Sequence, residues 1–73
     1  MTVSEIIREL GGPAYLGRQL GIRSQAISLW IRKNRIPAER VPDLERLARE
    51  RGVAVRAEQM RPDVRWSELR TAE

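Results

Sequence analysis

The chain has 73 residues, 33% of them charged and 41% hydrophobic, which is enough for one small domain near the lower size limit for folding without staples. It contains no cysteine and no histidine, which excludes disulfides, zinc sites built from these residues and histidine acid–base chemistry. No apolar run reaches membrane-spanning length and no export signal is evident, so we expect a cytoplasmic protein. Nothing in the composition indicates a cofactor, a metal, a membrane partner or a small-molecule ligand.

The net charge of +4 is concentrated in one part of the chain. Residues 18–40 hold six basic residues and one acidic residue, a net charge of +5. Residues 1–17 have a net charge of −1, and residues 41–73 hold seven residues of each sign. Because a merely solvated face usually mixes both signs, the basic segment predicts a surface for a polyanion.

The first predicted helix follows Thr2. Thr2 and Glu5 have the spacing of a capping box, in which each side chain accepts from the other residue's backbone N–H. Apolar residues then repeat at helical spacing until Gly11-Gly12 ends the element: Val3, Ile6, Ile7 and Leu10. We interpret this helix as scaffold.

Two short helical patterns separated by one glycine occupy residues 12–34. Pro13 suits the first position of a helix, where its missing N–H costs nothing. Gly21 can adopt the left-handed conformation that ends this helix. Gly17 is the small residue expected where two steeply crossing helices approach each other.

The second of these helices begins near Arg23–Ser24 and can end at Asn34, which tolerates positive φ. Its inward stripe is predicted to be Ile27, Trp30 and Ile31. Its outward face carries Ser24, Gln25, Ser28, Leu29, Arg32 and Lys33. The pattern is that of a helix-turn-helix. An ordinary helical hairpin is the alternative, but the glycine spacing and the local charge favour the helix-turn-helix.

Beyond the pair, a loop with one helical turn starting at Pro37 leads to a helix starting at Pro42. Because Val41 precedes this proline, it is expected to be extended. The buried face of the helix is predicted to be Leu44, Leu47 and Ala48, and Gly52 closes it. The helix covers the core.

The last third of the chain has weaker signals. Residues 53–55 are either a short strand or an extended connection, and residues 56–61 predict a short helix. Trp66 and Leu69 either fold back on the core, which is favoured, or meet a partner chain. We therefore expect an all-α fold of four to five helices, with a DNA-binding domain in residues 1–61 and a C-terminal tail in residues 62–73.

Residues 11 to 66 resemble the Cro-like and YdaS-like transcription regulators of phages and prophages. The specific part is Leu20-Gly21-Ile22, Ala26-Ile27-Ser28, and Trp30 followed by the exit Arg35-Ile36-Pro37-Ala38-Glu39-Arg40. The resemblance implies a compact domain like the DNA-binding domain of the phage λ repressor, which binds operator DNA and is usually dimeric.

Carried over by position, the resemblance assigns base contacts to Ser24, Gln25, Ser28, Leu29 and Arg32, and phosphate contacts to Arg18 and Arg23. The sequence departs from many relatives at two positions: they have a small polar residue where Arg23 stands and a polar residue where Leu29 stands. The base preferences of close relatives are therefore not transferred. By chemistry, Gln25 suits adenine, Leu29 suits a thymine methyl group, and Arg32 suits either guanine or phosphate. Lys33, Arg35 and Arg40 suit phosphate, which fixes register without reading sequence.

Two other function classes are alternatives to a DNA-binding regulator. An antitoxin-like module would bind another protein through the C-terminal apolar residues Met60, Trp66 and Leu69. Its binding would persist at high salt, whereas DNA binding through phosphates weakens. An enzyme is disfavoured because the acidic residues lie at predicted helix caps or among mixed charges. The prediction is a regulator, here a repressor, that acts on double-stranded DNA as a homodimer.

Overall fold

A computed structural model describes the backbone of residues 2–71 and the side chains of residues 2–68. Across these residues the structure is helical and contains no strand. The elements are α1 (Val3–Glu9), α2 (Pro13–Leu20), α3 (Ser24–Lys33), the short 3₁₀ helix η1 (Ala38–Arg40), α4 (Val41–Arg51), α5 (Ala57–Met60) and α6 (Trp66–Thr71). The all-α prediction is confirmed.

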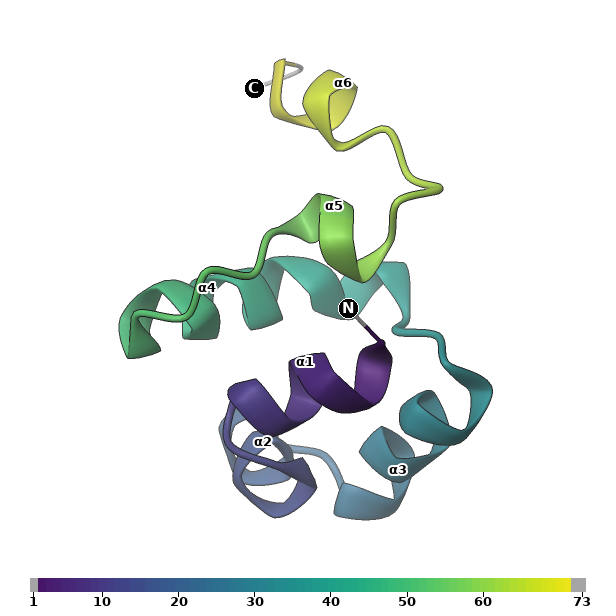
Figure 1. The fold of residues 1–73 in the computed structure, drawn as a ribbon, viewed down its shortest axis with the longest axis vertical. Helices are drawn as coiled ribbons and strands as arrows, with labels where there is room; N and C mark the ends of the chain where they lie inside the picture. The colour runs from purple at the N-terminus through teal and green to yellow at the C-terminus, as the bar shows by residue number, and fades with distance from the viewer. Residues whose placement is uncertain (1, 72–73) are drawn as a thin grey trace.

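The helices form two groups, and α1 lies between the α2–α3 pair and α4 (Figure 1). At one end α2 and α3 pack against each other, and both contact α1. At the other end α4 contacts η1 and α5, and α6 lies farther along the same direction. The helix-turn-helix is thus at one pole of the molecule and the C-terminal helices are at the other.

One hydrophobic cluster holds both groups together. Its largest fully buried side chains come from α1, α2, α3, α4 and the loops that follow α1 and α3: Ile6, Ile7, Leu10, Leu16, Ile27, Ile36, Val41, Leu44 and Leu47. No described polar or charged residue is buried. Hydrophobic burial, worth about 25 cal/mol per Å² of apolar surface, is therefore what fixes α3 on the scaffold.

Local signals placed most helix ends correctly. The Thr2–Glu5 capping box is present, and Pro13 is the first residue of α2. Gly21, Asn34 and Gly52 are left-handed and end α2, α3 and α4.

Three expectations need correction or a decision. The described chain has six α-helices rather than four to five, because α6 forms where a tail was predicted. Val41 is helical, with φ −62° and ψ −43°, since η1 leads directly into α4 and its buried side chain packs in the core. Residues 53–55 are not a strand: they join α4 to α5 without regular structure, and the N–H of Val55 donates locally to the carbonyl oxygen of Val53 at 3.0 Å.

Trp66 folds back on the core, as favoured from the sequence. Its side chain is 8% exposed, and its Nε1 donates to the carbonyl oxygen of Arg61 at 2.8 Å. Leu69 lies on α6, but its side chain is outside the described residues.

Candidate nucleic-acid interface

The turn between α2 and α3 is built around Gly17 and Gly21. Gly21 has φ +70°, and the N–H groups of Gly21 and Ile22 both donate to the carbonyl oxygen of Gly17. A Cβ added at Gly17 would lie 2.8 Å from the carbonyl oxygen of Ile22 and 3.4 Å from the backbone nitrogen of Ser24. The predicted close approach is therefore real, and it is to the backbone of the turn and the start of α3.

The helix α3 divides sharply into an inner and an outer side. Ile27 and Trp30 are buried, and Ile31 is half-buried against the same cluster. The side chains predicted to contact bases are all exposed on the other side: Ser24, Gln25, Ser28, Leu29 and Arg32. The helical period predicted this division correctly.

The C-terminal end of α3 is tied to α1. Asn34 has φ +51° and ψ +44°, the left-handed conformation that ends the helix. Its side-chain Oδ1 accepts a hydrogen bond from the backbone N–H of Val3 at 3.1 Å. This N–H is one of the first in α1 and has no partner within its own helix. One residue thus ends α3 and fixes its end against α1.

The predicted phosphate contacts surround α3. Arg18 lies on α2, and Arg23 is at the N-cap position of α3 without a side-chain capping bond. Lys33 is the last residue of α3 and Arg35 lies two residues farther on, and all four side chains are exposed. Arg40, on η1, is half-buried.

The basic residues of this surface form no salt bridge with another described residue, although the charge of Arg35 contributes to the lowered pKa of Asp63. The salt bridges found among the described residues all lie between residues 45 and 68. None includes a basic residue of the segment 18–40. The acidic residues of the C-terminal third are largely engaged within that third, so the positive potential around α3 stays available for a polyanion.

A groove beside α3 was not predicted. It has a volume of about 320 Å³ and lies between α3 and the exit segment of residues 34–37. Its lining residues are Ala26, Leu29, Trp30, Lys33, Arg35 and Pro37. The one sequence signal that pointed to it was the apolar Leu29 on an otherwise polar face.

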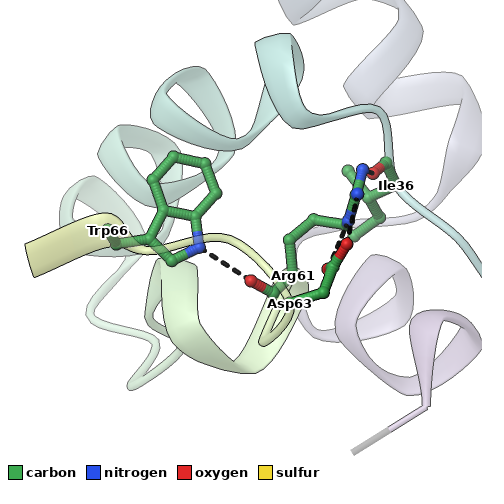
Figure 2. Close-up of polar contacts among 4 residues, drawn as sticks. All are labelled: Ile36, Arg61, Asp63 and Trp66. Atoms are coloured by element: carbon green, nitrogen blue, oxygen red, sulfur yellow. Dashed lines mark hydrogen bonds and ion pairs between the residues drawn. The ribbon is translucent and has the colours of Figure 1, made fainter. Parts of the chain in front are cut away.

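The C-terminal segment also contacts this exit segment (Figure 2). Nη1 of Arg61 donates to the carbonyl oxygen of Ile36 at 3.0 Å. Nε and Nη2 of Arg61 donate to the two carboxylate oxygens of Asp63 at 2.9 and 2.7 Å. These bonds from Arg61 lower the pKa of Asp63 to about 2. The hydrogen bond from Arg61 thus attaches the C-terminal segment to Ile36, the residue between Arg35 and Pro37.

The C-terminal apolar surface that an antitoxin-like module would use is not free. Met60 is 4% exposed and Trp66 is 8% exposed, and both belong to the hydrophobic core. Both side chains are committed to the fold, so this interface hypothesis fails for the described residues that were to carry it.

The described residues lack two further kinds of feature. No helix there has the length and apolarity needed to cross a membrane. No group of three or more acidic, histidine or cysteine residues there is arranged to hold a metal ion.

A compact helical domain with an exposed, basic second helix in a helix-turn-helix defines a class of regulatory domains. Residues 3–69 match a family model described as bacterial toxin YdaS, and the chain belongs to this family. The family-level resemblance read from the sequence is confirmed.

Two relatives are informative. The chain is 40% identical over 62 residues to a candidate transcriptional regulator, YdaS of Escherichia coli (strain K12). That match covers 84% of this chain and 60% of the relative, so the chain spans less than two thirds of the relative's length. The solved structure of the Cro protein from the candidate prophage element Xfaso 1 of Xylella fastidiosa strain Ann-1 is also 40% identical, with a TM-score of 0.69. The structural match covers 88% of this chain and 95% of the Cro chain.

Proposed function

We propose that this chain is a transcription regulator that binds double-stranded operator DNA with α3 in the major groove. The observation that carries the proposal is the division of α3 into a buried anchor and an exposed basic face. The descriptions of the relatives as a transcriptional regulator and as a Cro protein support the same function. Neither they nor the family description names an enzyme.

Each exposed residue of α3 has a proposed role in reading bases. Gln25 donates to and accepts from the adenine edge, and Leu29 contacts a thymine methyl group. Ser24 and Ser28 accept or donate with low selectivity. Arg32 reads guanine or holds phosphate.

Basic residues around α3 hold the DNA backbone in this proposal. They are Arg18, Arg23, Lys33, Arg35 and Arg40. Phosphate contacts release counterions from the DNA. The logarithm of the binding constant therefore falls linearly with the logarithm of the salt concentration, with a slope of about −0.9 per phosphate contact. We further propose a cytoplasmic homodimer on DNA, whose two α3 helices enter half-sites about one helical turn, roughly 34–36 Å, apart.

The experiment that tests this function is selection from a pool of random duplexes, followed by sequencing of the bound DNA. We expect a motif with two inverted half-sites, and binding that weakens steeply with salt. As a control, Arg46→Ala removes one positive charge from the exposed face of α4, away from α3. This variant should recover the same motif as the unaltered chain. Recovery of no motif, or binding insensitive to salt, would contradict the proposal.

The description of the family model as a toxin favours growth inhibition as a second candidate function. The same surface would cause it if binding of cellular promoters slows growth. In that case Gln25→Ala and Arg35→Ala should relieve inhibition on induced expression in proportion to their loss of DNA binding. Inhibition that persists in variants unable to bind DNA would assign toxicity to another part of the chain.

A further inference from the structure

The groove beside α3 is not fully used by the proposed reading of DNA. Four of its lining residues lie along one edge of α3 at positions i, i+3, i+4 and i+7: Ala26, Leu29, Trp30 and Lys33. Pro37 completes an apolar floor, and Arg35 stands beside Lys33 at the C-terminal end of α3. A methyl group of thymine would fill a small part of the 320 Å³.

Leu29 is the most exposed apolar residue that lines the groove. It is 44% exposed, and no other large hydrophobic side chain among the described residues is as exposed. Leu29, together with Trp30 and Pro37, forms an apolar binding site for an aliphatic or aromatic side chain. A sugar–phosphate backbone, which is anionic and hydrated, does not match such a floor.

The rim of the groove specifies the charge of the partner. Lys33 and Arg35 are exposed, and neither forms a salt bridge with a described residue. A second copy of this face is a poor occupant, because a two-fold contact would bring these cations close to their own equivalents. A segment with carboxylates beside an apolar anchor is complementary in both respects.

We propose that this groove binds an acidic segment of a partner protein, which inserts one large apolar side chain against Leu29, Trp30 and Pro37. Its carboxylates pair with Lys33 and Arg35. The inference rests on the proposed function in one respect: the bound segment covers Leu29 and Lys33, which are also proposed DNA contacts. Partner and DNA therefore exclude each other, and the partner relieves regulation.

The test is selection of displayed random peptides of about 12 residues on the full chain, in low salt. We expect enrichment of peptides with Asp or Glu next to Leu, Ile, Phe or Trp. A fluorescently labelled peptide from this pool should be displaced from the protein by duplex DNA. The fluorescence anisotropy of the peptide measures its affinity for each variant of the protein.

Two pairs of variants locate the binding. Ala26→Phe should fill the groove and weaken the peptide by about tenfold or more, the loss typical of a blocked anchor. Its control is Ala14→Phe, on the exposed side of α2. Arg35→Gln should weaken the peptide, whereas Arg46→Gln on α4 should not. Circular dichroism checks that each variant is folded, and if Ala26→Phe is not, Ala26→Leu replaces it.

The outcomes separate this inference from the proposed function. If peptides bind as expected and no duplex binds, the binding of an acidic segment in the groove stands, but its competition with DNA and the proposed DNA function both fail. If duplex binds but no acidic peptides are enriched, or Ala26→Phe leaves their affinity unchanged, the groove proposal is overturned. It is overturned as well if Ala26→Phe weakens DNA and not peptide, because the groove is then part of the DNA site.

Discussion

Gly17 shows how one missing side chain sets the geometry of the turn before α3. Any Cβ at this position meets the carbonyl oxygen of Ile22 at 2.8 Å, and a backbone atom cannot move aside as a flexible side chain would. We expect Gly17→Ala and, more strongly, Gly17→Val to lower the free energy of unfolding by about 1–3 kcal/mol. Thermal melts followed by circular dichroism measure it. Ala14→Val, on the exposed side of the same helix, is the control. If Gly17→Val melts at the same temperature as wild type, Gly17 does not lie at the close approach to the turn.

Asn34 combines two roles that substitution can separate. Asn34→Gly keeps the left-handed backbone but loses the hydrogen bond to Val3, a loss of about 0.5–1.5 kcal/mol. Asn34→Ala loses the bond and adds about 1–2 kcal/mol of left-handed strain. We therefore expect stability to fall in the order wild type, Gly, Ala in urea unfolding.

Asn34→Asp completes that series, since it keeps an acceptor oxygen and tolerates positive φ. It should unfold nearer to wild type than Asn34→Ala does. If the alanine variant is as stable as wild type, Asn34 does not hold the end of α3.

At the scale of the element, the two ends of α3 have different proposed roles: one contacts bases and the other contacts phosphates. Gln25 lies in the first turn of the helix, and Arg35 lies just beyond its end. Gln25→Ala should cost about 1–3 kcal/mol on the preferred site and much less on random DNA. Arg35→Ala should weaken both by similar factors and lower the salt slope by about one unit.

Titrations of both variants against specific and random duplexes at several salt concentrations measure this contrast. Both residues are exposed, so neither change should alter the melting temperature much. A specific-to-random ratio that is unchanged in Gln25→Ala and collapses in Arg35→Ala would mean that α3 docks differently.

At the scale of the whole molecule, Arg61 and Asp63 connect the C-terminal segment to the exit of α3. The pKa of Asp63 is lowered from 3.8 to about 2, chiefly by its hydrogen bonds from Arg61. A depressed pKa means that the folded state binds this proton less readily than the unfolded chain does. The stability it contributes is thus complete above about pH 4 and is lost as the pH falls toward 2.

We expect Asp63→Asn to lower the urea midpoint at pH 6 and to flatten its decline between pH 4 and pH 2. Measuring midpoints across this range for wild type and variant tests it. Glu50→Gln, which breaks the exposed Arg46–Glu50 pair on α4, is the matched control. The prediction fails if Asp63→Asn declines with pH as steeply as wild type.

The sequence by itself determined the helix ends and the outward face of α3. The capping box of Thr2 and Glu5, the proline that starts α2 and the left-handed Gly21 act within a few residues. The 3.6-residue period acts within one helix, so it separated the exposed Gln25 from the buried Ile27 without knowledge of the fold. Signals of this range can be read directly from residue order.

Tertiary structure alone decided the features that join distant residues. Val41 is helical despite the proline after it, because its side chain is buried in the core. Asn34 bonds to Val3 across 31 positions, and Arg61 bonds to Ile36 across 25. The groove needs Pro37 beside Leu29, and the anchoring of α6 needs a core to receive Trp66. Such contacts exist only once the chain has closed on itself, since their partners have no local relation in the sequence.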